Sequence, residues 1–414
     1  MEHTIDQIAK EAKRASRVLG KMSTQQKNQI LLAIADAVES HSNEIIEANK
    51  IDLQNARENG VPTVMQDRLL LDQKRIGDMS KGVRQVVALS DPIGEVVEGF
   101  VRPNGLKISK VRVPLGVVGI IYEARPNVTL DAIGLTLKTG NGVVLKGGKE
   151  AICSNRTIVQ IASQAGEKAG MPKGAIGFID RTDREATTYM MGLNGLIDVL
   201  IPRGGAGLIQ SVVKNATIPV IETGVGNCHV YVDASADVDM AADIVINAKT
   251  SRPSVCNACE SFLVHKDIAD EFMPVILKRL EEKDVEVVGC ERSRAYGKME
   301  LATSEDYAKE FLDYKISVKI VDSIDEAIDH ITQYGTMHSE CIVTKSFESA
   351  QKFTLEVDAA AVYVNASTRF TDGFEFGFGA EIGISTQKLH ARGPMGLREL
   401  TSTKYTILGD GQIR

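Results

Sequence analysis

Short, continuous runs of apolar residues separate longer amphipathic stretches through most of this 414-residue chain, and this alternation constrains the fold more than any other feature. After Pro114 the runs, for example 117–122 and 143–146, alternate with stretches of helical periodicity. A strand with one face in water alternates apolar and polar residues, whereas a parallel strand covered on both faces is apolar throughout. The pattern therefore predicts a doubly wound α/β domain.

The rest of the chain adds four segments to this domain. The first ninety residues have apolar positions at helical spacing. Residues 94–113 alternate β-forming residues around Asn104-Gly105, which is a strong hairpin signal. A second series of strands and helices begins near Ser261, and a last strand is predicted at 403–408. We expect two α/β domains and a small β arm.

Charge and composition exclude several classes of protein. Lys and Arg total 48 against 55 Asp and Glu, a net charge of −7, so a nucleic acid is not the expected partner. No apolar stretch approaches the 18 residues of a membrane helix, and the start does not resemble a secretion signal. The six cysteines are too sparse for a disulfide framework. We expect a cytoplasmic protein with reduced thiols and no membrane partner.

The segment 251–260 contains the cysteine best placed for chemistry, at the junction of the two α/β series. Arg252 near Cys256 would favour the nucleophilic thiolate, although a free cysteine is more often a small core residue. Cys256 and Cys259 form a CxxC pair, but no second Cys or His pair follows at zinc spacing. We therefore predict no metal site, and the residues alone leave the role of Cys256 open.

Two glycine-rich turns follow predicted strands. Lys146, Gly147, Gly148 and Lys149 would place backbone amides and ammonium groups at the carboxyl edge of a parallel sheet, where nucleotides bind. Gly204-Gly205 forms a similar turn. Each could instead be a tight turn with solvated lysines, and the GxGxxG fingerprint is absent.

Two polar residues stand near predicted strand ends. Asn127 could donate its amide to an oxyanion or cap a helix. Glu222 follows a predicted strand at 219–221 and could act as a general base or as a solvated carboxylate.

The order of these pieces resembles the aldehyde dehydrogenase superfamily, and longer motifs resemble its gamma-glutamyl phosphate reductase family. The motifs are YEARPNVT at 122–129, RPSVCNA at 252–258 and ISTQKLHARGP at 384–394. The stretch 321–342, which includes His330 and His338, is also similar to this family, although we assign no mechanism to either histidine. The resemblance spans essentially the whole chain.

The resemblance implies an aldehyde dehydrogenase-like fold. Its parts would be an NADPH-binding domain at 1–93 and 114–250, a catalytic domain at 251–395, and a β oligomerisation arm at 94–113 and 396–414. It also implies NADPH-dependent reduction of L-glutamyl 5-phosphate to L-glutamate 5-semialdehyde with release of phosphate, the second step from glutamate to proline.

The family's roles pass to matching positions of this chain. Cys256 would form a thioester, and Asn127 would stabilise the oxyanion. Lys146, Gly147, Gly148 and Lys149 would hold the cofactor, together with Gly204 and Gly205. Relatives that prefer NAD have a glutamate where this chain has Lys149, whose charge favours the 2′-phosphate of NADPH.

Other roles are less determined by the resemblance. Arg125, Arg252 and Arg369 would pair with the anionic groups of the substrate, or with structural partners. The alternative function is a hydrolytic aldehyde dehydrogenase that uses Glu222 as its base. Cys259 could form a disulfide with Cys256 on oxidation. The resemblance also implies a homo-oligomer and a functional contact with glutamate 5-kinase.

Overall fold

The structure is a computed structural model that describes residues 2–414, so Met1 of the predicted first domain lies outside the described residues. It divides into two compact units. Unit 1 comprises Met1–Thr223, Gly377–Gly383 and Met395–Arg414, and unit 2 comprises Gly224–Phe376 and Ile384–Pro394.

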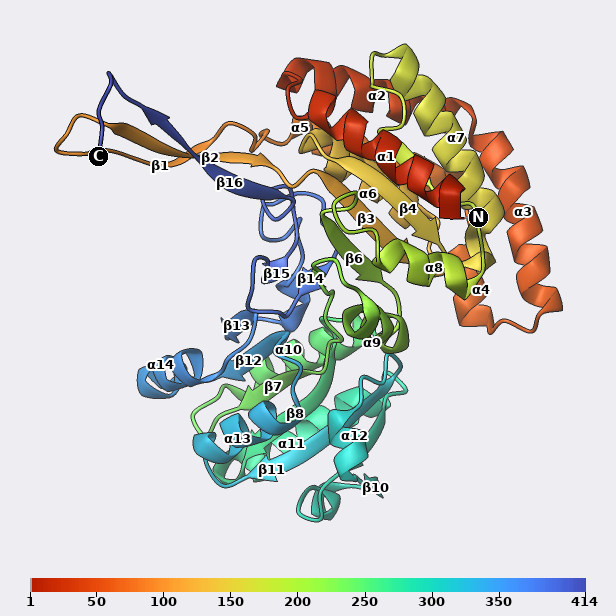
Figure 1. Ribbon diagram of the computed structural model, residues 1–414. Helices are drawn as coiled ribbons and strands as arrows, with labels where there is room; N and C mark the ends of the chain where they lie inside the picture. Colours follow the sequence, from red (N-terminus) through yellow and green to blue (C-terminus); the bar gives the residue numbers. More distant parts are fainter. Residues whose placement is uncertain (1) are drawn as a thin grey trace. The chain divides into compact units, whose positions relative to one another are not determined.

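Unit 1 is built on a four-stranded parallel sheet in the order β5-β4-β3-β6 (Figure 1). The strands are β3 (Val117–Tyr122), β4 (Gly142–Gly147), β5 (Ile176–Phe178) and β6 (Val199–Arg203). Every residue of β3 and β4 is buried. The continuous apolar runs therefore correspond to strands covered on both faces, and the predicted parallel sheet is confirmed.

Helices cover both faces of this sheet. They are α1 (Glu2–Leu19), α2 (Thr24–Ser40), α3 (Ser42–Glu58), α4 (Thr63–Leu69), α5 (Gln73–Ala88), α6 (Asn127–Lys138), α7 (Ile152–Lys168), α8 (Arg184–Met191) and α9 (Ala206–Asn215). One hydrophobic cluster joins α1, α8 and α9 to β3, β4 and β6. The predicted helical character of the first ninety residues is confirmed.

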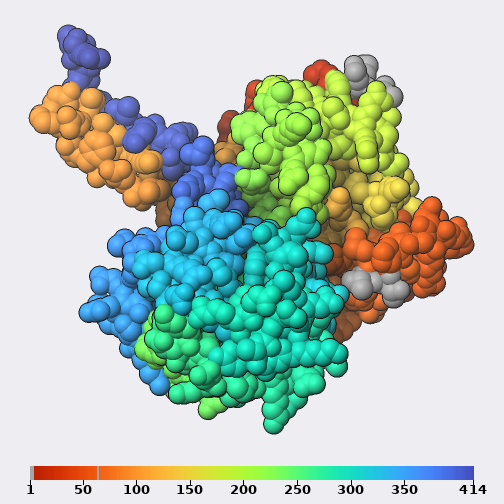
Figure 2. Space-filling model, turned by 90° about the horizontal axis from the view of Figure 1, so that it is seen from below, coloured from red at the N-terminus to blue at the C-terminus, as the bar shows by residue number. Residues whose placement is uncertain are grey.

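The arm of unit 1 is a three-stranded antiparallel sheet in the order β1-β2-β16. Its strands are β1 (Val96–Val101), β2 (Lys107–Pro114) and β16 (Thr401–Leu408). Gly105 in the connecting turn has φ of +88°, a conformation that glycine adopts without strain. Figures 1 and 2 show the hairpin, in orange, and β16, in dark blue, as a narrow extension of this unit.

Unit 2 contains a seven-stranded parallel sheet in the order β10-β9-β11-β8-β7-β12-β13. The strands are β7 (Cys228–Val232), β8 (Cys259–His265), β9 (Glu286–Gly289), β10 (Glu300–Leu301), β11 (Lys315–Val321), β12 (Ser339–Val343) and β13 (Ala361–Val364). Helices α10 (Val238–Thr250) and α11 (Lys266–Glu281) pack on one face. Helices α13 (Ile324–Tyr334) and α14 (Phe347–Glu356) pack on the other. The predicted pair of α/β domains with a small β arm is confirmed.

Short elements complete the chain. They are η1 (Lys149–Ala151), η2 (Ser293–Tyr296), α12 (Ser304–Ala308), η3 (Thr368–Phe370), β14 (Ile384–Ser385) and β15 (Gly393–Pro394). None of the helices formed by residues 2–414 is long and apolar enough to cross a membrane.

The structure differs from the sequence predictions at two places. The units divide after Thr223 rather than after residue 250, because β7 pairs with β8 and β12 and so carries 224–250 into unit 2. The predicted strand at 219–221 is a single bridge between Val220 and Leu200. The run before Glu222 is therefore too short to extend the sheet of unit 1.

Candidate active site

The carboxyl edge of the unit 1 sheet gathers the predicted cofactor residues. Tyr122 at the end of β3 pairs with Gly147 of β4 and with Arg203 of β6. The turns that follow these strands therefore begin side by side. This edge is the usual place for a nucleotide in an open α/β sheet.

Lys146 is the buried cation of this edge. Its residue is 4% exposed, and its Nζ donates to the carbonyl oxygen of Gly147 at 3.2 Å. Burial lowers the pKa of Lys146, opposed by the charges of Asp183 and Glu150. No ion pair formed by the described residues includes Lys146. A buried ammonium with only a backbone partner is suited to binding hydroxyl or phosphate oxygens.

The glycine turns after β4 and β6 lie close to Glu123, which follows the strand between them. A Cβ on Gly204 would overlap the carboxylate of Glu123, and one on Gly148 would lie 3.4 Å from its Cα. The amide of Gly205, just before α9, donates to Oε2 of Glu123 at 2.9 Å. Lys149 is exposed in η1. Sequence reasoning missed Glu123, although its place directly after β3 was a signal.

Asn127 is the first residue of α6 and not its N-cap, which is Pro126. Its Nδ2 donates to Oδ2 of Asp131 at 3.1 Å, and the amide carries a second N–H. Burial raises the pKa of Asp131 to about 6, against the hydrogen bond from Asn127 and the charge of Arg203. A small cavity of about 40 Å³ beside them is also lined by Arg125.

Cys256 lies in unit 2 on a tight turn before β8. The amide of Ala258 donates to the carbonyl oxygen of Val255 at 3.1 Å, which makes Cys256 and Asn257 the two central residues of the turn. Cys256 is partly exposed. A nucleophile on such a turn can meet a substrate while its backbone remains fixed.

Two arginines accompany this turn. Nε of Arg369 donates to Oγ of Ser251 at 3.0 Å, and its guanidinium also bonds the side chain of Asn257. Burial, and then repulsion by Arg252, lowers the pKa of Arg369, while the charge of Cys256 opposes this. Among the described residues, neither arginine has a carboxylate partner within ion-pair distance. The turn therefore carries positive charge available to an anion.

Of the other cysteines of unit 2, Cys228, Cys259 and Cys341 are buried and Cys290 is partly exposed. Cys259 is the first residue of β8, and its Sγ donates to the carbonyl of Ser261 at 3.1 Å. Burial raises the pKa of the Cys259 thiol. Neither Cys256 nor Cys259 is part of a disulfide. The suggested disulfide between them is therefore not formed in this structure.

His330 and His338 lie inside unit 2. His330 packs against Tyr307 and Tyr334, with ring centroids 4.9 and 4.7 Å away. Burial lowers its pKa to about 2, assisted by His229. Burial lowers the pKa of His338 to about 4. Both rings are therefore neutral at pH 7 and belong to the packing of this unit.

Glu222 and Cys256 are placed in different units. Glu222 is half-buried, and the hydroxyl of the next residue, Thr223, donates to the carbonyl of Pro202 at 2.9 Å. Among the described residues, no group of three or more His, Cys, Asp or Glu side chains is arranged to hold a metal.

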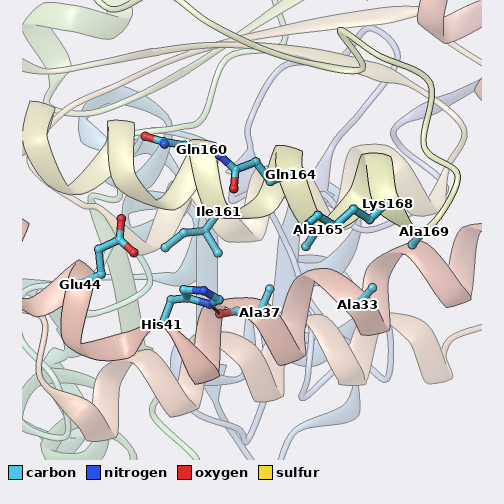
Figure 3. A pocket seen from close by; sticks show the side chains of 10 residues that line it. All are labelled: Ala33, Ala37, His41, Glu44, Gln160, Ile161, Gln164, Ala165, Lys168 and Ala169. Carbon is cyan, nitrogen blue, oxygen red and sulfur yellow. Dashed lines mark hydrogen bonds between the residues drawn. The ribbon is translucent and has the colours of Figure 1, made fainter.

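A cavity of about 450 Å³ in unit 1 contains none of the predicted site residues (Figure 3). Its walls are small apolar side chains of α2 and α7, and its polar residues include His41, Glu44 and Lys168. Nδ1 of His41 is bonded to the carbonyl of Ala37 at 2.8 Å. The side chains of His41, Glu44 and Lys168 are exposed, so this is an open groove between helices.

Comparisons with known proteins agree with this geometry. The model of the aldehyde dehydrogenase family matches residues 1–293. A gamma-glutamyl phosphate reductase of Clostridium novyi is 62% identical, with 100% of each chain covered. The chain belongs to the gamma-glutamyl phosphate reductase family. A reductase of the same name from Heliobacterium modesticaldum is 61% identical over 98% of this chain and 97% of its own.

A solved structure supports the same membership. The crystal structure of gamma-glutamyl phosphate reductase from Thermotoga maritima is 50% identical, covers 99% of both chains and has a TM-score of 0.97. An acetylating aldehyde dehydrogenase of Geobacillus thermoglucosidasius is 17% identical, with a TM-score of 0.71 and coverage of 100% of this chain and 98% of its own. The fold is therefore shared well beyond the reductase family.

Proposed function

We propose that this protein reduces L-glutamyl 5-phosphate to L-glutamate 5-semialdehyde and releases phosphate, using NADPH, in the second step from glutamate to proline. The observation that carries the proposal is the partly exposed Cys256 on its turn, beside Arg252 and Arg369. The high identity to reductases of this name over the whole chain supports the choice of substrate.

Arg252 and Arg369 favour both the thiolate form of Cys256 and the binding of an anionic substrate. A neighbouring guanidinium stabilises a thiolate relative to a thiol, and the thiolate is the attacking form. Guanidinium groups also bind phosphate and carboxylate through paired hydrogen bonds. Because Arg252 and Arg369 are in the same unit as Cys256, we assign them to the anionic groups of the substrate. Arg125 of unit 1 is retained as a third candidate.

The proposed reaction passes through covalent intermediates on Cys256. Its sulfur attacks the acyl carbon, and the C–O bond to phosphate breaks to give a thioester and free phosphate. When bound, NADPH supplies the hydride that reduces this thioester. The thiohemiacetal on Cys256 then releases the aldehyde and returns the thiolate.

Negative charge develops on the acyl oxygen when the acyl carbon becomes tetrahedral. We assign its stabilisation to the second N–H of the Asn127 amide and to the backbone N–H of Cys256. A preorganised donor of this kind contributes about 3 kcal/mol in other enzymes. Glu222 has no step in this direction of the reaction, because no water is activated.

The carboxyl edge of the unit 1 sheet fits the cofactor. Lys146 is a buried ammonium with a single backbone partner, and Gly147 and Gly148 leave the edge open to a ligand. Lys149 is exposed beside them and would pair with a 2′-phosphate. Gly204 and Gly205 support the assignment less strongly, because Glu123 already accepts the Gly205 amide.

We also propose that the arm joins copies of this chain. Every residue of β1 is exposed, including Val96, Phe100 and Val101, and among the described strands β1 pairs with β2 alone. An exposed apolar edge strand is a template for pairing with another strand. A monomer in size-exclusion chromatography would contradict this.

We also propose that the protein is cytoplasmic and that it contacts glutamate 5-kinase. The kinase contact is supported by the family resemblance alone.

The experiment that tests the function measures the reverse reaction. With glutamate 5-semialdehyde and NADP⁺, we expect cofactor reduction that requires inorganic phosphate and yields an acyl phosphate. Reduction that ignores phosphate and yields free glutamate would instead indicate the hydrolytic alternative. That alternative further requires Glu222→Gln to abolish turnover, whereas the proposed reaction requires the variant to remain active.

A further inference from the structure

The turn that carries Cys256 has a central peptide whose orientation defines the type of turn. In a four-residue turn, types I and II differ by rotation of the central peptide, whose carbonyl here belongs to Cys256. Type II requires a positive φ at the third residue, a conformation that asparagine tolerates. Asn257 occupies that position, and its φ is not positive. The flipped turn is therefore sterically accessible to this sequence and must be disfavoured by contacts.

Gly226, which lies just before β7, and Cys228, its first residue, surround that carbonyl. Sγ of Cys228 donates to the carbonyl oxygen of Cys256 at 3.2 Å. A Cβ on Gly226 would overlap the same oxygen, so only glycine leaves room for it. Cys228 is fully buried, and burial raises the pKa of its thiol well above the usual range. The thiol consequently keeps its proton at neutral pH and remains a donor.

The other side of the turn is tied to the segment after β13. Nδ2 of Asn257 donates to the carbonyl of Thr371 at 2.9 Å, and Oγ1 of Thr368 donates to the carbonyl of Asn257 at 2.7 Å. Oγ1 of Thr371 lies 2.6 Å from Oγ of Ser339, which lies 2.8 Å from Nδ1 of His338. That ring nitrogen is 3.6 Å from Sγ of Cys228. A closed network of hydrogen bonds thus surrounds the turn.

We propose that Cys228 is a positioning residue, whose S–H fixes the central peptide of the Cys256 turn while Gly226 leaves space for its carbonyl. Fixing this peptide sets the ψ angle of Cys256, and with it the relation of the nucleophile to the backbone that follows. The proposal deepens the proposed function and rests on Cys256 being the nucleophile.

The test compares variants at Cys228 with a matched control. Cys228→Ala and Cys228→Val remove the donor, Val with little loss of volume, and Cys228→Ser keeps a donor. Cys341→Ala is the control, because Cys341 is equally buried in β12, the strand beside β7, and bonds no atom of the turn in the described contacts. Each variant is measured for kcat, for KM, and for the rate at which iodoacetamide alkylates Cys256, followed by peptide mass spectrometry.

We expect variants without a donor to lose kcat and Cys256 alkylation rate by roughly tenfold, equivalent to about 1.4 kcal/mol, with KM changed less than about twofold. Cys228→Ser should recover most of this loss, and Cys341→Ala should match the wild type. A folded donor-free variant, Ala or Val, that matches the wild type would overturn the proposal, as would a serine variant no better than that variant. Absence of phosphate-dependent turnover in the wild type would refute the proposed function, and the alkylation rates would still decide the role of Cys228.

Discussion

At the scale of single residues, the site depends on charges that lack a carboxylate partner. Lys146 is buried with one backbone carbonyl, and Arg252 and Arg369 stand beside Cys256. A buried cation without a partner is unfavourable unless a ligand compensates it. This requirement links the positions of these residues to an anionic substrate and a phosphorylated cofactor.

Lys149 provides the residue-scale prediction. Lys149→Glu should weaken NADPH binding by roughly tenfold to a hundredfold, because a charge-assisted hydrogen bond of about 1.5–3 kcal/mol is replaced by repulsion. NADH binding should weaken less or improve. Dissociation constants are measured from the fluorescence of each reduced nucleotide.

The control is Lys173→Glu, the same change at an exposed lysine that precedes β5 and so lies at the opposite edge of the sheet. It should bind both nucleotides like the wild type. Equal weakening by the two variants would show a general effect of charge and would remove Lys149 from the cofactor site.

At the scale of elements, β8 anchors the segment that carries Cys256. Its second residue, Glu260, pairs with Lys249 of α10 at 2.6 Å, and both side chains are fully buried. Glu260 also accepts the amide of Leu312 at 3.2 Å. This pair joins the helix before the catalytic turn to the strand after it.

Removing one partner of this ion pair should lower the free energy of unfolding. Glu260→Met should destabilise the protein by about 3–5 kcal/mol, because the Lys249 charge is left buried without a partner. The double variant Glu260→Met with Lys249→Met should recover much of that loss. The urea midpoint of each variant is the measurement. A double variant no more stable than the single one would show that the charge of Lys249 is not the source of the loss.

The elements also show how far the sequence determines the fold. Local patterns predicted β3 at 117–122 and the hairpin around Gly105, because neighbouring residues along the chain define them. It missed β7, whose first residues, Cys228 and His229, are polar or small and face partners far along the chain. The predicted boundary at residue 250 therefore differs from that of the compact units, which divide after Thr223.

The residues of the site also divide into those that local sequence predicts and those that it does not. Cys256, Lys146 and Asn127 stand in local motifs that a sequence displays. Cys228 and Glu123 act through contacts with residues 28 and 82 positions away, and no local pattern predicts such contacts. The available signals were the place of Glu123 directly after β3 and Gly226 just before β7, since glycine there leaves room for the Cys256 carbonyl.

At the scale of the whole molecule, buried histidines should make stability depend on pH. The pKa of His330 is lowered to about 2 in the folded state, mainly by burial and then by the neighbouring His229, against about 6.5 when unfolded. The unfolded chain therefore binds the proton first. The contribution to stability is complete above pH 6.5 and is lost as the pH falls toward 2.

Between pH 7 and pH 5 this loss is about 2 kcal/mol for one histidine of this kind. His330→Phe keeps a ring against Tyr307 and Tyr334 but cannot titrate. The unfolding free energy of the variant should fall by about 2 kcal/mol less than that of the wild type over this range. Equal losses in the two proteins would exclude His330 as a source of the pH dependence.

The central claim is that Cys256 is the nucleophile of a phosphate-dependent reductase, and one measurement tests it most directly. Phosphate-dependent reduction of NADP⁺ by glutamate 5-semialdehyde is compared in the wild type, Cys256→Ala and Cys259→Ser. Cys259 is buried in the core of unit 2, so its serine variant should retain turnover, whereas Cys256→Ala should have none. Turnover that persists in Cys256→Ala would contradict the account.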